Sequence, residues 1–109
     1  MKSKIKNDRM KRKTSVSHDD VVVHWIKKDP EFAAGYLKAA LEDSDERRVL
    51  SVALRHLAQA YGIAKVAKTA GVERESLYRA LSEKGSPRLS TLVAVTKIIG
   101  LRLTVEPSL

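Results

Sequence analysis

Side chains that can contact nucleic acid gather in one stretch of the chain, residues 62–82, which reads GIAKVAKTAGVERESLYRALS. An arginine can donate two parallel hydrogen bonds to a guanine edge or to a phosphate, and a tyrosine can reach a phosphate or a thymine methyl group. The chemistry indicated is hydrogen bonding to DNA rather than catalysis. The polar residues of the second half fall at helical spacing, away from the apolar ones: Arg74, Glu75, Ser76, Tyr78 and Arg79.

Two short helices and a tight turn would position these side chains. Gly71 is expected to adopt the left-handed backbone conformation of the turn, and Ala67, four residues earlier, is small enough for the helices to cross closely. The pattern predicts a helix-turn-helix unit whose second helix begins near Glu73 and enters the major groove. The alternative is a plain helical hairpin. The apolar residues expected beneath the crossing are Val66, Ala70, Val72, Leu77, Ala80 and Leu81.

The charge distribution favours DNA contact by this stretch. The net formal charge of the chain is +8, and residues 61–88 carry six basic and three acidic side chains, whereas residues 15–60 carry six basic and eight acidic ones. The acidic part is therefore better suited to meet another protein than to lie on phosphates. The cations predicted to contact the DNA backbone beside the motif are Lys65, Lys68, Lys84 and Arg88.

A basic tail precedes the helical part. Residues 1–14 carry a net charge of +6 and few apolar side chains, which predicts disorder. Its role stays open between a solvated leader and a basic arm that touches DNA or folds on a partner, and Met10 offers a later start of translation.

Composition argues against a catalytic centre. The 109 residues include no cysteine, which excludes disulfides and thiolate metal sites. His18, His24 and His56 lack the spacing of a helical metal pair, and phosphate-binding glycine loops are absent. No apolar run is long enough for export or for a bilayer span. We expect a single-domain, cytoplasmic, nucleoid-associated protein that is not an enzyme, needs no metal or cofactor and contacts no membrane.

Apolar periodicity predicts an all-α fold of five to six helices over residues 15–109. Asp29 before Pro30 is a good helix start, and Asp43 and Glu46 stand at capping-box spacing for a helix that begins at Asp43 or Ser44. The first predicted helix contains β-branched residues and is alternatively a strand. Besides those of the motif, the predicted helices cover residues 17–28, 30–42, 44–61 and 89–99.

The final segment changes period. Leu101, Leu103 and Val105 alternate with Arg102 and Thr104, which is typical of a half-buried β-strand. A lone strand is not stable, so residues 101–106 are predicted to pair with the same strand of a second copy. Such a homodimer would present two recognition helices to a palindromic operator. The alternatives are a strand that lies against the helices and a disordered tail.

From Asp29 to Glu106 the chain resembles the HigA-like addiction-module antidote proteins of the lambda-repressor-like superfamily. The resemblance implies a five-helix DNA-binding domain that represses its own operon and neutralises a RelE/ParE-like toxin encoded beside it. By position it also assigns the five polar residues of the second motif helix to the recognition surface. The similar runs are DPEFAAGYLKAALED at 29–43, LRHLAQAYG at 54–62, AGVERESLYRALSEKGSPRLSTL at 70–92 and GLRLTVE at 100–106.

Two positions depart from the family pattern. Glu73 stands where a serine or asparagine usually caps the recognition helix, and its charge is unfavourable near phosphates. Ser86 replaces a frequent asparagine before proline. In addition, Glu75 and Arg79 have the spacing of a helical salt bridge, which would leave Arg79 less free for DNA than Arg74.

The sequence thus predicts a dimeric, sequence-specific repressor that acts as the antitoxin of a type II toxin-antitoxin module. One alternative is a solitary helix-turn-helix regulator without a toxin. The other is a protein-binding module in which the helix-turn-helix is only scaffold and the acidic helices at 30–60 hold a basic toxin.

Overall fold

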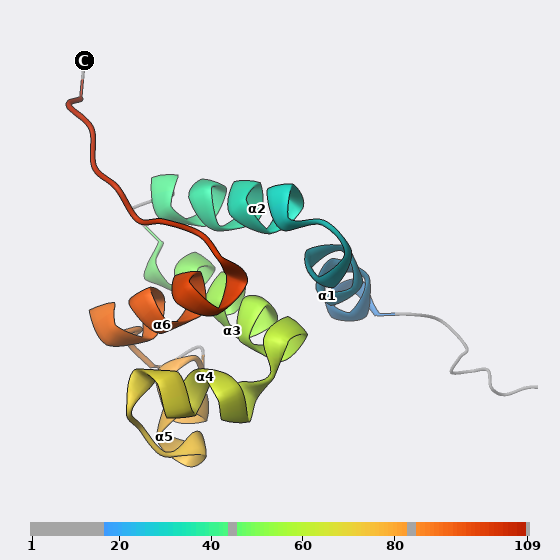
Figure 1. Cartoon of the computed structure of the whole chain (residues 1–109), viewed down its shortest axis with the longest axis vertical. Coiled ribbons are helices and arrows are strands. Elements are labelled where there is room, and N and C mark those ends of the chain that lie inside the picture. Colours follow the sequence, from blue (N-terminus) through green and yellow to red (C-terminus); the bar gives the residue numbers. More distant parts are fainter. Residues whose placement is uncertain (1–16, 44–45, 83–84, 109) are drawn as a thin grey trace, which may run out of the picture.

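The computed structural model describes residues 17–43, 46–82 and 85–108, and its regular structure is helical throughout (Figure 1). The predicted all-α class is confirmed, and the segment from residue 17 is a helix rather than a strand. The basic tail, Met10 and Lys84 lie outside the described residues. The helices of the described part are α1 (His18–Lys28), α2 (Pro30–Glu42), α3 (Arg47–Tyr61), α4 (Ile63–Ala70), α5 (Arg74–Ala80) and α6 (Leu89–Ile99).

Short polar side chains cap the first two helices. The Ser17 hydroxyl accepts a hydrogen bond from the backbone N–H of Asp20 at 3.1 Å, and the Asp29 carboxylate accepts one from Glu31 at 3.0 Å. Pro30 occupies the first turn of α2, as predicted, because its missing N–H would have no partner there anyway.

The predicted start of α3 was wrong. Asp43 ends α2 instead, with its backbone N–H donating to the carbonyl of Ala39, and α3 begins only at Arg47. Glu46 is the N-cap residue of α3 and makes no side-chain capping hydrogen bond. The spacing of Asp43 and Glu46 thus marks a turn between two helices, in which the N–H of Glu46 donates to the carbonyl of Asp43 at 3.4 Å.

Helix α3 is the centre of the fold. It packs against α1, α2, α4 and α6, and its Leu54, Leu57 and Ala58 are completely buried. Figure 1 shows α2 on one side of it and the α4–α5 pair on the other. Helix α3 therefore joins the N-terminal helices to the predicted DNA-binding unit. The other helices contribute to the same core through Ile26, Leu37, Val66, Leu77 and Val95.

The C-terminal strand predicted at 101–106 is absent. After Gly100 ends α6, the backbone N–H of Leu101 donates to the carbonyl of Thr96 at 2.8 Å, and residues 101–108 continue without regular structure. A β-ladder needs a second strand, and the described chain offers only helices beside this segment. The side chains do not alternate in burial either, because Leu101 is half-buried whereas Leu103 and Val105 are 38% and 96% exposed.

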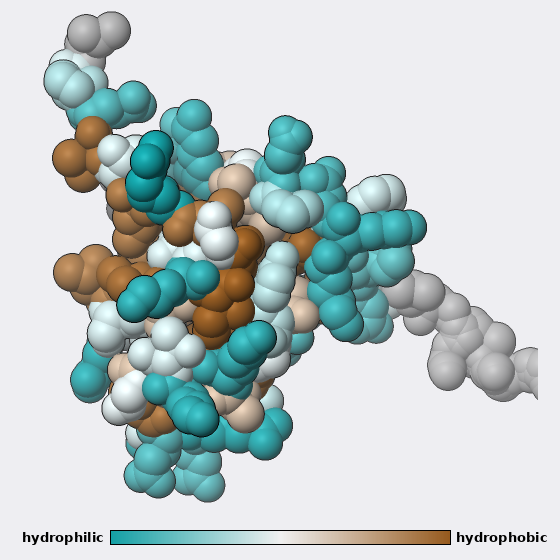
Figure 2. Space-filling view, in the orientation of Figure 1, coloured by the Kyte–Doolittle hydropathy of each residue, from teal (hydrophilic) through white to brown (hydrophobic). Residues whose placement is uncertain are grey.

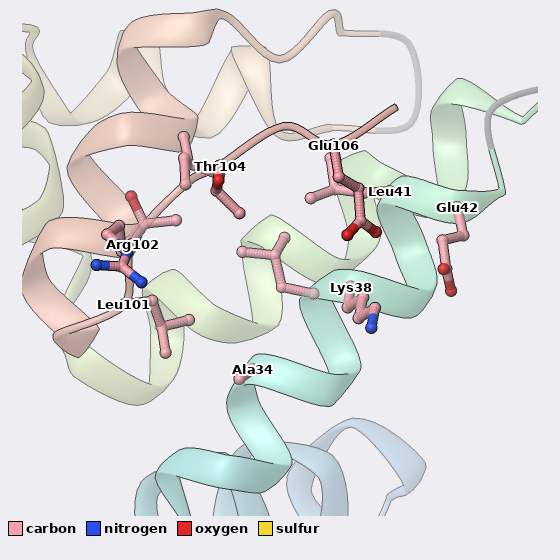
Figure 3. Close-up of a pocket in the computed structure, with 11 residues that line it drawn as sticks. Ala34, Lys38, Leu41, Glu42, Leu101, Arg102, Thr104 and Glu106 are labelled. Carbon is pink, nitrogen blue, oxygen red and sulfur yellow. The ribbon is translucent and has the colours of Figure 1, made fainter. Parts of the chain in front are cut away.

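A groove of about 460 Å³ separates this C-terminal segment from α2. Figure 3 shows Ala34, Lys38, Leu41 and Glu42 of α2 on one side of the groove, and Leu101, Arg102, Thr104 and Glu106 on the other.

Candidate nucleic-acid interface

The two helices predicted for the motif form one end of the molecule. Helices α4 and α5 are joined by a turn at Gly71, which has the predicted left-handed conformation with φ 74° and ψ 31°. Its N–H donates to the carbonyl of Lys68 at 3.2 Å, and Val72 donates to Ala67 at 3.0 Å. Ala67 is 3% exposed, as expected of a small residue at a helix crossing.

Helix α5 turns one side to the core and another to solvent. Leu77 and Leu81 are each 1% exposed, which fixes the rotation of the helix. The predicted recognition residues occupy the rest of the helix surface: Arg74, Glu75, Tyr78 and Arg79 are exposed and Ser76 is half-buried. Of the cations predicted to contact the DNA backbone, Lys65, Lys68 and Arg88 are also exposed.

The salt bridge that the spacing of Glu75 and Arg79 allows does not form. Within the described part of the chain, the Arg79 guanidinium donates to the Ser76 hydroxyl at 3.2 Å, three residues away, and forms no ion pair with Glu75. The Ser82 hydroxyl in turn donates a hydrogen bond to the carbonyl of Arg79 at 2.8 Å. Glu73, the departure from the family pattern, makes no side-chain capping hydrogen bond, and α5 starts after it as predicted.

Gly85 holds the segment after α5 against the end of that helix. Its N–H donates to the carbonyl of Ser82 at 3.0 Å, and a Cβ added at Gly85 would lie 2.2 Å from the carbonyl oxygen of Arg79 and 2.6 Å from that of Ala80. The neighbouring Ser86 accepts a hydrogen bond from Arg47 of α3 at 3.4 Å. No sequence pattern indicates this close approach, because a loop glycine is common for many reasons.

Replacing Gly85 with alanine is expected to destabilise the protein by about 1 to 3 kcal/mol, because the methyl group must push two backbone carbonyls of α5 aside. A thermal unfolding midpoint measured by circular dichroism checks this. Gly35→Ala is the matched control, because Gly35 lies in α2 with no atom within 4 Å of an added Cβ. This variant should leave the midpoint unchanged or raise it. Equal midpoints for both variants would contradict the close approach.

A hydrogen-bond network around the buried His56 fastens α1 and α2 to α3, and sequence reasoning missed it. His56 of α3 is 2% exposed, and its Nε2 lies 2.8 Å from a carboxylate oxygen of Asp19 in α1. Its Nδ1 bonds the hydroxyl of Tyr36 in α2. Because a carboxylate only accepts hydrogen bonds, Nε2 of the ring donates to Asp19. The network thus gives His56 a structural role.

The network shifts the pKa values of two side chains, Asp19 and Tyr36. The hydrogen bond from His56, and then the charge of that ring once protonated, lower the pKa of Asp19 below its ordinary value of 3.8. Burial, and then the negative charge of Asp19, raise the pKa of Tyr36. A lowered carboxylate pKa means that folding favours the ionised form.

Asp19→Asn is therefore expected to cost stability at neutral pH and progressively less below pH 3.8, as the wild-type carboxylate becomes protonated in both states. Asparagine keeps an acceptor for Nε2 and removes only the charge, so the comparison isolates the ionic part. Denaturant unfolding of both proteins across an acid pH series measures the difference. A difference that stays constant through that range would contradict the assignment.

Other kinds of site find no support in the part of the chain that the structure describes. No group of three or more metal-ligating side chains comes together there. Among the six helices α1–α6, none combines the length and apolar character that crossing a membrane requires.

Comparison with known proteins agrees with the resemblance drawn from the sequence. A family model described as "Probable addiction module antidote protein" matches residues 19–107. A relative from Haemophilus influenzae (strain ATCC 51907 / DSM 11121 / KW20 / Rd), described as an uncharacterized protein, is 37% identical over 73 residues, which cover 67% of this chain and 74% of the relative. No solved structure matches the chain. The chain therefore belongs to the family of probable addiction module antidote proteins.

Proposed function

We propose that the chain is a sequence-specific DNA-binding repressor, which acts in the cytoplasm on the nucleoid as the antitoxin of a type II toxin-antitoxin module. The observation that carries the DNA-binding part is the exposed side of α5. Arg74, Tyr78 and Arg79 are exposed on a helix at one end of the molecule, and the buried Leu77 anchors that helix to the core. A recognition helix needs this arrangement to reach base edges in the major groove.

A homodimer is the second part of the proposal, and its proposed interface is an apolar surface rather than a pair of β-strands. Figure 2 shows hydrophobic side chains gathered over α6 and the C-terminal segment. A second copy covering this surface would remove apolar area from water and relate two recognition helices by a two-fold axis. The interface would include Arg102 and Thr104 together with Leu101, which is half-buried, and the exposed Leu89 (72%), Val93 (41%), Leu103 (38%) and Val105 (96%).

Sedimentation of the purified chain should therefore give the mass of a dimer at micromolar concentration. Replacing Val93 and Leu103 together with aspartate should give a monomer, because charges would enter an apolar interface. A wild-type chain that sediments as a monomer would contradict the dimer.

The third part is a toxin partner, RelE/ParE-like as the resemblance implies, and the N-terminal helices are the surface proposed for it. Residues 17–43 carry six acidic side chains against three basic ones, a net of −3, and all six acidic residues are exposed. Trp25 of α1 and Phe32 of α2 are 49% and 38% exposed, and aromatic side chains are common anchors in protein interfaces. A basic toxin would be complementary to this part of the molecule.

A reporter gene behind the promoter of the chain's own operon tests the repressor. Expression of the chain should lower the reporter signal, and the Arg74→Ala variant should restore it while the protein stays folded. A signal that does not respond to the wild-type chain would contradict autorepression.

A further inference from the structure

A polar cleft of about 550 Å³ lies beside the recognition helix, between α5 and residues 86–88 that lead into α6. Val72, Leu77 and Ala80 form its apolar part. Its polar lining consists of cations and hydroxyl groups, and no carboxylate is among the described residues that line it. These polar residues are Ser76, Arg79, Ser86, Arg88 and Thr91. Two guanidinium groups beside hydroxyl donors suit a phosphate ligand.

The orientation of α5 assigns its arginines to different sides. Successive residues of a helix are rotated by about 100°, so Ser76 and Ala80 lie on the flank that lines the cleft, and Arg74 and Tyr78 lie on the other flank. The hydrogen bond to Ser76 at 3.2 Å draws the Arg79 guanidinium toward the cleft and away from Glu75. Arg74 and Tyr78 do not line the cleft.

We propose that this cleft binds one phosphate of the DNA backbone, with Arg79 and Arg88 as its charged ligands, and that base reading on α5 falls to Arg74 and Tyr78. The inference rests on the proposed DNA binding and divides the work within it. Arg79 then contributes affinity for any duplex, whereas Arg74 contributes the preference for the operator.

The position of Gly85 supports this division. The same close approach that seats Gly85 on the carbonyls of Arg79 and Ala80 places Ser86 and Arg88 across the cleft from α5. The packed backbone at Gly85 thus holds the segment that carries Arg88 against the end of α5.

The salt dependence of DNA binding separates the two roles. Fluorescence anisotropy would measure the association constants of the full chain with a duplex carrying the promoter of its own operon and with a scrambled duplex of equal length, over a salt series. Loss of one phosphate contact lowers the slope of log K against log salt by about 0.9 per protomer. Arg79→Ala and Arg88→Ala should each lower this slope on both duplexes. Neither variant should change the ratio of the association constants for the promoter and the scrambled duplex.

Arg74→Ala should instead lower that ratio, and Lys27→Ala on α1, which removes the same charge far from α5, should change neither quantity. An Arg79→Ala variant that keeps the wild-type slope and loses the ratio would overturn the proposal. If the wild-type chain binds both duplexes equally, sequence-specific binding fails, and the slope on the scrambled duplex still decides whether Arg79 and Arg88 bind phosphate.

Discussion

The double variant Arg74→Ala, Arg79→Ala is expected to bind the promoter of its own operon at least about 100-fold more weakly than the wild-type chain. A bidentate arginine contact to a base contributes about 1 to 3 kcal/mol, and a charged phosphate contact adds to it. Both side chains are exposed, so the core should not change. Anisotropy titration measures the loss, and a thermal melt checks that the fold is intact.

Lys27→Ala, Lys28→Ala provides the matched control. It removes two positive charges from the end of α1, on exposed residues outside the proposed interface. Non-specific electrostatics alone would make the two double variants equally weak. The arginine variant should also still neutralise the toxin, because the surface proposed for the toxin lies on α1 and α2. Promoter binding that survives the arginine variant would refute the assignment of α5 as the recognition helix.

Leu57→Ala is expected to be among the most destabilising truncations of the described residues. Leu57 is 0% exposed on α3, the helix that packs against α1, α2, α4 and α6. Truncation of a buried leucine costs about 2 to 5 kcal/mol, which is a large share of the 5 to 15 kcal/mol that stabilise a typical domain. The thermal midpoint should fall by at least about 10 °C, since a domain of this size loses roughly 4 to 8 °C per kcal/mol.

Val21→Ala on α1 is the control for this truncation. Val21 is 42% exposed, so truncation of its apolar side chain to alanine should cost much less. Far-ultraviolet circular dichroism during heating follows both variants. A midpoint for Leu57→Ala within a few degrees of the wild type would contradict the central place of α3 in the core.

The helices and the motif turn could be predicted because their signals are local. Gly71 favours the left-handed backbone conformation of the motif turn. Asp29 and Pro30 favour the start of a helix, and Gly100 favours the end of one. Each of these residues acts within one turn of its own position. The helix-turn-helix follows from that information with the small Ala67 at the crossing.

The omissions come from contacts between different elements of the chain. His56 meets Asp19 and Tyr36 across 37 and 20 residues, and no periodicity indicates that such groups will meet. Gly85 is confined by the carbonyls of another element, which only the packed structure can show.

At the C-terminal segment the prediction failed for the opposite reason: a local pattern was present but its structural partner was not. Its alternating pattern predicted a strand from local information, but a strand exists only when another one pairs with it. In the described chain the segment runs past α2 and leaves Val105 exposed. The pattern therefore indicates an apolar surface, and the proposed dimer depends on that surface rather than on a β-ladder.

The comparison of specific with non-specific DNA binding tests the central claim most directly. The wild-type chain would be titrated into a duplex carrying the promoter of its own operon and into a scrambled duplex of equal length and composition, at one near-physiological salt concentration. A sequence-specific repressor is predicted to bind the promoter about a thousand-fold or more tightly than the scrambled duplex. Equal affinity for the two duplexes would contradict sequence-specific recognition by α5 and would favour the helix-turn-helix as a scaffold for protein binding.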